Sequence, residues 1–119
     1  MPVSDNKNQQ RKFSSGAVRD SSADKGRFDL LPPRALFLLA KHFQAGAARY
    51  GERNWEKGMP VSVFIDSGFR HLIQFMACKE NEDHLVAAAW NLLAAIETRE
   101  RIKEGILPDE LSWKPEPPK

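Results

Sequence analysis

The stretch PVSVFIDSGFRHLIQFM, residues 60–76, carries the strongest structural signal in this chain. Its large apolar side chains recur every three or four positions, which predicts a helix rather than a strand. We expect Ser62 to cap the start of this helix, because a serine hydroxyl can accept a hydrogen bond from an unpaired backbone N–H. Apolar residues cover most of the circumference: Phe64, Ile65, Phe69, Leu72, Ile73, Phe75 and Met76.

The following stretch, NEDHLVAAAWNLLAAIETRERIKEG at residues 81–105, predicts a second long helix. Asn81 is the expected N-cap, and Gly105 is the expected stop because glycine readily adopts the backbone conformation that ends a helix. The apolar stripe of this helix is formed by Leu85, Ala89, Leu92, Leu93 and Ile96.

Upstream, a third helix is predicted to open at Pro32 and Pro33 and to end at Gly51. A polar loop, residues 51–58, then leads into the helix after Pro60. The core region has no useful run of period-two alternation, the pattern of a half-buried strand. We therefore expect an all-α fold with about three main helices.

Composition separates the helical region from the two ends of the chain. Residues 1–24 are rich in Asn, Gln, Ser, Lys and Arg, so they are expected to form a flexible polar leader. Residues 107–119 contain four prolines and are expected to form an extended arm. The intervening domain, residues 25–106, is small enough that one core supplies only modest stability. We therefore expect a homo-oligomer, either a dimer or a tetramer.

Charge and cysteine content exclude several classes of protein. The formal net charge is +2, which does not favour a specific nucleic-acid binder with a clustered basic face. No apolar run approaches the roughly 20 residues that span a bilayer, so no membrane association is expected. A single cysteine, Cys78, excludes an internal disulfide framework and suits a reducing compartment. The expected location is the cytoplasm.

Polar residues interrupt the apolar surface of the 60–76 helix. Asp66 and Arg70 are four positions apart and share a face, with His71 one position further round. One interpretation is an intrahelical ion pair beside an interfacial histidine. The other is a ligand site, because polar groups among aromatic side chains are partly desolvated and need a partner.

The junction before the last helix packs Glu80, Glu82, Asp83 and His84 into five positions. Acidic groups in a first helical turn are favoured by the helix dipole, and this explains them without any ligand. Carboxylates are also the ligands that Mg²⁺ and Mn²⁺ prefer, usually together with substrate phosphates. Both interpretations remain open from the sequence alone.

Two further features are candidates for ligand contact. Asn91 lies seven positions after His84, so both side chains project to one side of the helix. The Asn91 amide either contacts a ligand or forms a buried structural hydrogen bond. Lys25 and Arg27 flank a glycine shortly before a predicted helix start, where positive potential favours phosphate. A flexible cationic lip explains Lys25 and Arg27 equally well.

Four segments in order resemble one known pattern: KGRFDLLP (25–32), GAARYGERNW (46–55), RHL (70–72) and HLVAAAWN (84–91). The pattern resembles small phage-encoded dATP/dGTP diphosphohydrolases, relatives of the MazG-like all-α pyrophosphohydrolases, from about Gly16 to Ile102. This resemblance implies an oligomeric MazG-like helical bundle that uses Mg²⁺ or Mn²⁺ to cleave a purine deoxynucleoside triphosphate into monophosphate and pyrophosphate. In phages that replace adenine by 2-aminoadenine, such enzymes supply dGMP.

The wider family pairs its metal-binding acids as Glu-x-x-Glu and Glu-x-x-Asp, whereas this chain has Ala88-x-x-Asn91. The nearest substitutes are Asp66, Glu80, Glu82 and Asp83, with Glu52 or Glu56 from the loop. The resulting roles are hypotheses. The metal ligands are Glu80, Glu82 and Asp83, with Asp83 at the catalytic centre, and Asp66 or His71 orients the attacking water. The phosphate charge is neutralised by Lys25, Arg27 and Arg70. The other substrate contacts are Asn54, Trp55, His84 and Asn91.

A different class of function also fits the sequence. A chain that lost the acidic pairs would be a non-catalytic nucleotide-binding protein on the same fold. A helical interaction module anchored by Trp55, Trp90 and Trp113 is the other alternative, because tryptophans are frequent anchors of protein interfaces.

Overall fold

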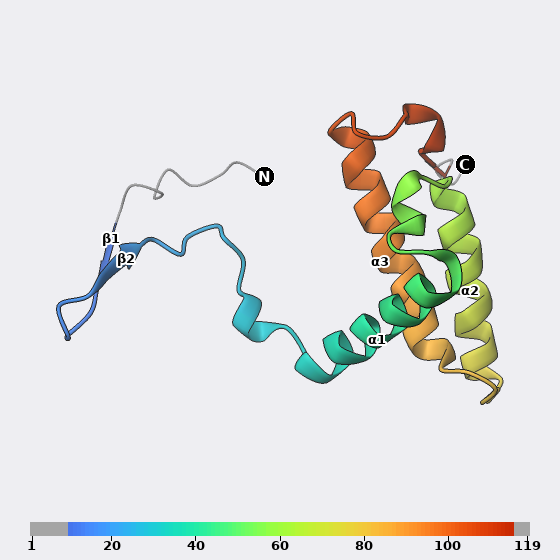
Figure 1. Ribbon diagram of the computed structural model, residues 1–119, viewed down its shortest axis with the longest axis horizontal. Coiled ribbons are helices and arrows are strands. Elements are labelled where there is room, and N and C mark those ends of the chain that lie inside the picture. Colours follow the sequence, from blue (N-terminus) through green and yellow to red (C-terminus); the bar gives the residue numbers. More distant parts are fainter. Residues whose placement is uncertain (1–9, 116–119) are drawn as a thin grey trace. The chain divides into compact units, whose positions relative to one another are not determined.

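The computed structural model describes residues 10–115 and is mostly helical (Figure 1). Its three long helices are α1 (Pro33–Tyr50), α2 (Val61–Met76) and α3 (His84–Lys103). The predicted all-α class with three main helices is confirmed. None of the helices within residues 10–115 is long and apolar enough to cross a membrane. The chain divides into two compact units, Met1–Pro32 and Pro33–Lys119, and each is considered by itself.

The N-terminal unit contains a hairpin where the sequence predicted a flexible leader. Strand β1 (Gln10–Lys12) pairs antiparallel with β2 (Val18–Asp20), and the short 3-10 helix η2 (Phe28–Leu30) follows. Gly16 permits the turn because it has a positive φ of 94°. Every strand residue is exposed, so the hairpin buries no apolar stripe. This explains why hydrophobic periodicity does not predict it.

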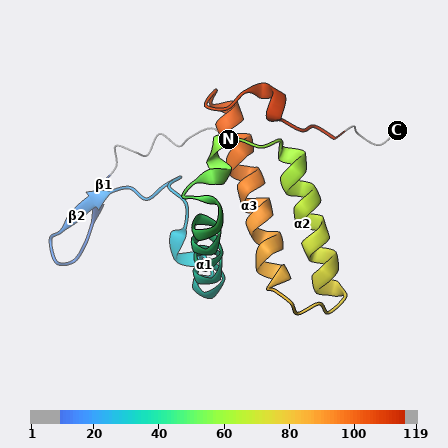
Figure 2. The same cartoon turned by 45° about the vertical axis from the view of Figure 1, so that its right-hand side comes forward.

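In the helical unit, α2 and α3 run antiparallel and side by side, with α1 on the other side of α3 (Figures 1 and 2). Small residues allow the two backbones to approach closely. A Cβ placed on Gly68 of α2 would lie 3.4 Å from the Asn91 Cβ and 3.6 Å from the Ala88 carbonyl oxygen of α3. The α2–α3 hairpin is therefore packed through its smallest side chains.

The structure buries a different face of α3 from the one that carries its apolar stripe. Its apolar stripe is exposed in the single chain, with Leu85, Leu92 and Ile96 each about half accessible. The buried face of α3 is instead small and polar: His84, Ala87, Ala88, Asn91, Ala94, Ala95 and Thr98. Gly68 faces the alanine side of α3, because only that side admits a helix at such short distance.

Both predicted N-caps of the last two helices are wrong. Helix α2 is capped by Pro60 without a side-chain hydrogen bond, so Ser62 lies inside the helix and is exposed. Helix α3 is capped by Asp83, whose Oδ1 accepts a hydrogen bond from the Val86 N–H at 3.1 Å. The side chain of Asn81 is thereby left for another partner, described below.

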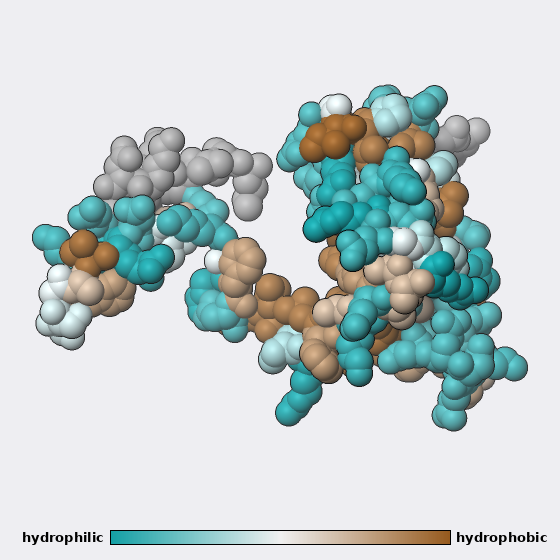
Figure 3. Space-filling view, in the orientation of Figure 1, coloured by the Kyte–Doolittle hydropathy of each residue, from teal (hydrophilic) through white to brown (hydrophobic). Residues whose placement is uncertain are grey.

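Helix α1 reaches the pair through aromatic contacts near its C-terminal half. The rings of Phe43 and Trp90 are 5.7 Å apart, and Trp55 in the short helix η3 (Asn54–Lys57) lies 5.9 Å from Phe43. The first turns of α1 expose Leu36, Phe37 and other apolar side chains. In the space-filling view, hydrophobic colour accordingly appears along the course of α1 (Figure 3).

The C-terminal segment is less extended than the prolines predicted. After α3, Gly105 turns the chain with a φ of 77°, and the short helix η4 (Asp109–Leu111) follows. Leu107 and Leu111 pack against Gly58, where an added Cβ would lie 3.1 Å and 3.0 Å from their methyl groups. Residues 107–115 thus fold back on the loop before α2, and residues 116–119 lie outside the described part.

Candidate functional site

Three metal-competent side chains meet where α2 ends and α3 begins. His71 comes from the second half of α2, His84 opens α3, and Glu82 lies in the turn between the two helices. The ligand atoms of this cluster all lie within 4.8 Å of one another. The two Nδ1 atoms are 2.9 Å apart, and Glu82 Oε1 lies 3.9 Å from His71 Nδ1 and 3.7 Å from His84 Nδ1.

The hydrogen bond of Asn81 determines which nitrogen of His84 faces the cluster as an acceptor. The Asn81 Oδ1 lies 2.8 Å from His84 Nε2, and an amide oxygen only accepts, so Nε2 carries the hydrogen. A neutral His84 then has a lone pair at Nδ1. The short Nδ1–Nδ1 contact is consequently a hydrogen bond that His71 donates and His84 accepts.

The environment keeps His71 in the state that binds a metal. Burial lowers the pKa of His71, the carboxylate of Glu82 opposes this, and the neighbouring His84, Arg70 and His42 lower it further. A lowered pKa means that the imidazole is neutral at pH 7. Neutral imidazole is the form that ligates metal ions.

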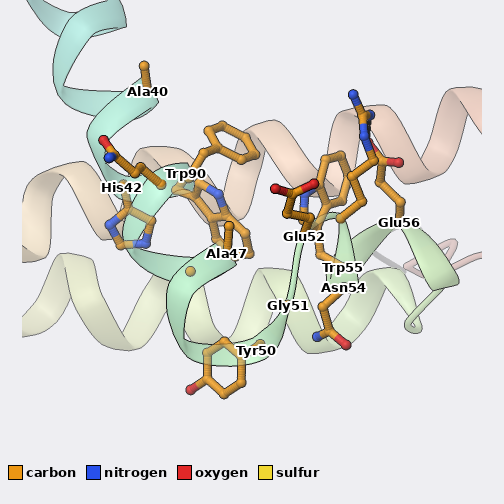
Figure 4. A pocket seen from close by; sticks show the side chains of 14 residues that line it. Ala40, His42, Ala47, Tyr50, Gly51, Glu52, Asn54, Trp55, Glu56 and Trp90 are labelled. Atoms are coloured by element: carbon orange, nitrogen blue, oxygen red, sulfur yellow. Dashed lines mark hydrogen bonds and ion pairs between the residues drawn. The ribbon is translucent and has the colours of Figure 1, made fainter.

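A pocket of about 550 Å³ lies between α1, the loop after it and α3. Its walls are aromatic, with Phe43 and Tyr50 of α1, Trp55 of η3 and Trp90 of α3 (Figure 4). Polar groups interrupt the aromatic surface at a few positions: His42, Gln44, Glu52, Asn54 and Glu56. Ligand pockets typically combine this volume, an apolar lining and a few polar groups.

His42 connects the pocket with the histidine cluster. Its ring lies 5.4 Å from Trp90 in the pocket wall, and its charge is one of those that lower the pKa of His71. Along α3, Trp90 follows His84 by six residues, a rise of about 9 Å at 1.5 Å per residue. Cluster and pocket are thus neighbours along α3.

A family model described as dATP/dGTP diphosphohydrolase, N-terminal, matches residues 15–106, which is well over half of the chain. The chain belongs to this diphosphohydrolase family. It is therefore a dNTP diphosphohydrolase, and the enzyme class predicted from the four segments is confirmed. No curated protein and no solved structure matches the chain.

The cluster of this diphosphohydrolase brings together three residues for which the sequence predicted three different roles. Glu82 was a predicted metal ligand, His71 a predicted water-orienting group and His84 a predicted substrate contact; all three now share one centre. Asn54 and Trp55, predicted to meet the base or sugar, both line the aromatic pocket.

Other predicted acids lie apart from this centre. Asp66 is highly exposed and forms a solvent-facing ion pair with Arg70 at 3.5 Å, as the simpler interpretation of that spacing predicts. The Asp83 carboxylate caps α3. Glu80 is exposed and does not join the three-residue cluster in the described part of the chain. The metal-ligand set predicted as Glu80, Glu82 and Asp83 therefore shares only Glu82 with the observed cluster.

Two of the remaining predicted contacts, Asn91 and Arg27, have partners of their own. Asn91 is buried against α2, and its Nδ2 donates a hydrogen bond to the Ala87 carbonyl at 2.9 Å. This is the buried structural hydrogen bond that the sequence offered as the alternative to ligand contact. Lys25 and Arg27 belong to the N-terminal unit, where Arg27 binds both carboxylate oxygens of Asp29 at 2.8 and 2.7 Å. This bond lowers the pKa of the Asp29 carboxyl.

Sequence reasoning missed His42, Gln44 and the role of Asn81. His42 directly precedes Phe43 within a mostly apolar part of α1, and a histidine beside an aromatic residue there was the available signal. The contact of Asn81 with His84 spans only three positions, but it was interpreted as capping because Asn is a common N-cap.

Proposed function

We propose that this enzyme hydrolyses dATP or dGTP to the deoxynucleoside monophosphate and pyrophosphate, with a divalent ion, Mg²⁺ or Mn²⁺, held by His71, Glu82 and His84. The observation that carries the proposal is the approach of three ligand atoms to within 4.8 Å beside an aromatic pocket. Three protein ligands leave coordination positions for substrate oxygen atoms, as catalytic metal sites require.

The donor set fits a divalent ion on chemical grounds. Two imidazole nitrogens and one carboxylate are established ligands of catalytic metals. His84 is almost fully buried, whereas Glu82 is half exposed, so the centre is anchored on one side and open on the other. A bound ion there would neutralise phosphate charge and polarise a water molecule.

The reaction transfers the deoxynucleotidyl group to water. The water oxygen forms a bond to the α-phosphorus, the bond from this phosphorus to the bridging oxygen breaks, and pyrophosphate leaves. Such transfers need positioning and charge neutralisation more than covalent help from protein. Arg70 directly precedes His71 on α2, and its side chain is exposed. It is our candidate for a phosphate contact. Lys25 and Arg27 stay candidates for the same role on sequence grounds alone.

We assign the purine base to the aromatic pocket. Stacking of a base on an aromatic side chain is worth about 1–3 kcal/mol, and Trp55 and Tyr50 both line this pocket. Asn54 and Gln44 offer amide groups that can both donate and accept hydrogen bonds to a purine edge.

We also propose that two copies assemble through the exposed apolar sides of α2 and α3. On α2, Ile65, Phe69, Leu72 and Met76 follow a helical spacing, as do the exposed apolar residues of α3. A shared hollow joins the two sides: Val61, Ile65, Leu92, Ala95 and Ile96 all line it. Stacking two hairpins would give the four-helix arrangement common among helical enzymes.

The small size of the single-chain core supports this assembly. Among the described residues, the buried apolar side chains are Val61, Phe64 and four alanines: Ala87, Ala88, Ala94 and Ala95. A core this small contributes little hydrophobic stabilisation, because the free energy scales with buried apolar area. A second copy with the same exposed sides would bury them in a symmetric interface.

The cellular setting is part of the proposal. We place the reaction in the cytoplasm, which suits a chain whose one cysteine, Cys78, is free and exposed. The resemblance to phage enzymes favours a role in supplying purine monophosphates to modified-purine synthesis.

The direct test incubates the pure protein with each dNTP and rNTP in Mg²⁺, Mn²⁺ or EDTA and separates the products. We expect monophosphate and pyrophosphate from dATP or dGTP, and no product in EDTA. Release of inorganic phosphate in place of pyrophosphate, or undiminished turnover in EDTA, would contradict the proposal. Binding of dATP or dGTP without cleavage would instead favour a non-catalytic nucleotide-binding protein.

A further inference from the structure

We propose that the centre formed by His71, Glu82 and His84 selects a first-row transition-metal ion over Mg²⁺, and that Asn81 holds His84 in its metal-binding form. The inference rests on the proposed function, which requires a divalent ion without choosing among them. The distinction matters because the sequence, with its three neighbouring carboxylates, predicted an all-oxygen site.

The chemistry of the donor atoms argues for a transition metal. Mg²⁺ prefers oxygen ligands in a strict octahedron and loses its waters reluctantly. Imidazole nitrogen suits Zn²⁺, Co²⁺, Fe²⁺ and Mn²⁺, and two histidines with one carboxylate form a recurrent site for such ions. The cluster offers two nitrogens, of His71 and His84, for one carboxylate, of Glu82.

The spacing of the nitrogens also fits. Two nitrogens bound to one ion at about 2.0–2.1 Å lie about 2.8–3.4 Å apart for bond angles between 90° and 110°. The Nδ1 atoms of His71 and His84 are already 2.9 Å apart. The Glu82 oxygen, at 3.7 Å and 3.9 Å from them, belongs to a half-exposed side chain that can rotate inward.

Asn81 acts as a positioning residue for His84. Its amide oxygen accepts the Nε2 hydrogen at 2.8 Å, so the lone pair of a neutral His84 stays at Nδ1, toward the cluster. Histidine ligands commonly donate their other ring N–H to such an acceptor, which fixes both tautomer and ring orientation. Without Asn81, His84 would be free to carry its hydrogen at Nδ1, where it blocks ligation.

The proton that now joins the two histidines has a defined destination. When an ion occupies the centre, His71 Nδ1 must offer its lone pair, so its hydrogen moves to Nε2 by exchange with water. Both rings remain neutral, and the binding step needs no further reactant.

The experiment measures metal binding directly, without turnover. Metal-free full-length protein is titrated with Mn²⁺ by electron paramagnetic resonance and with Mg²⁺ by calorimetry, and Co²⁺ is followed by its visible absorption. We expect Mn²⁺ to bind at least about tenfold more tightly than Mg²⁺, and Co²⁺ more tightly than Mn²⁺. Equal affinity for Mg²⁺ and Mn²⁺ would overturn the assignment.

Variants locate the binding site. Glu82→Gln and His71→Ala should reduce Mn²⁺ binding to the Mg²⁺ level, whereas Glu80→Gln, an exposed acid two positions away, should leave it unchanged. Asn81→Leu should weaken Mn²⁺ binding about 10–100-fold, and Asn81→Asp, which keeps an acceptor, should restore it. Circular dichroism verifies that each variant is folded. Full Mn²⁺ affinity in folded His71→Ala and Glu82→Gln would exclude this site.

The outcomes separate the inference from the proposed reaction. Tight Mn²⁺ binding that depends on His71, with no cleavage of dATP or dGTP, would support the centre and contradict the proposed function. Cleavage that proceeds fully in Mg²⁺, together with Mn²⁺ binding that does not depend on His71 and Glu82, would support the proposed reaction. The same result would contradict the assignment of the metal centre.

Discussion

The two long faces of α3 differ in composition, and their roles are opposite to what hydrophobicity suggests. The face toward α2 carries alanines with three polar side chains, and it is buried. The leucine-rich face is about half exposed. Two of these polar groups are satisfied on their own helix: Asn91 donates to the Ala87 carbonyl at 2.9 Å and Thr98 to the Ala94 carbonyl at 2.8 Å.

This difference separates two tasks within one helix. The small face, which is the buried face with the alanines, permits α2 and α3 to approach closely. This holds His71 and His84 within hydrogen-bond distance at the end of the hairpin. The large face, which is the leucine-rich face, is left for a partner, because it contributes little to the core of the single chain. The three predictions that follow test this separation, in order of their expected effect on the free energy of unfolding.

The largest effect is expected on the small face. Ala94 is fully buried, so Ala94→Leu has no room for its larger side chain and should lower the free energy of unfolding by about 3 kcal/mol. Glu97→Leu adds the same side chain to an exposed position one turn later and should change it by less than about 0.5 kcal/mol. Urea denaturation of both variants measures the difference, and equal values would contradict the assignment of faces.

Both ends of α1 and the end of α3 could be predicted from the sequence because proline and glycine set them locally, whereas the predicted caps of α2 and α3 were wrong. Pro33 and Gly51 bracket α1, and Gly105 follows α3 within two residues. The orientation of α3 could not be predicted in the same way. Periodicity identifies residues that share a face, but which face meets a neighbouring helix depends on how closely that helix approaches, and here Gly68 makes the alanine side accessible.

The candidate site was predictable residue by residue, not as an assembly. His71, Glu82 and His84 each stood out as polar groups in or beside an apolar helix. Their meeting depends on the turn between α2 and α3, which places side chains 13 positions apart at 2.9 Å. Asp83 looked like a ligand for the same reasons as Glu82, because sequence does not reveal which carboxylate is taken up by the helix cap.

An intermediate effect is expected at that cap, where the buried face begins. Asp83→Ala removes the acceptor for the Val86 N–H and should lower the free energy of unfolding by about 1 kcal/mol. Asp83→Asn keeps an acceptor and should lose less. Thermal unfolding measures both values. If Asp83 were a metal ligand instead, Asp83→Asn would abolish Mn²⁺ binding while remaining stable, whereas the cap role predicts unchanged binding.

The smallest effect on the single chain is expected on the large face, at Leu92. Leu92→Glu places a charge on a side chain that is 50% exposed in the single chain, so its folding free energy should change by less than about 0.5 kcal/mol. In the proposed dimer the same charge would be buried without a partner, which is strongly unfavourable. Light scattering coupled to size exclusion should therefore show a dimer for the parent chain and a folded monomer for Leu92→Glu. Lys41→Glu, a charge reversal at an exposed position of α1, is the matched control for general surface charge. A Leu92→Glu variant that stays dimeric would mean that the exposed leucines serve another purpose, and a parent chain that is monomeric would contradict the proposed dimer.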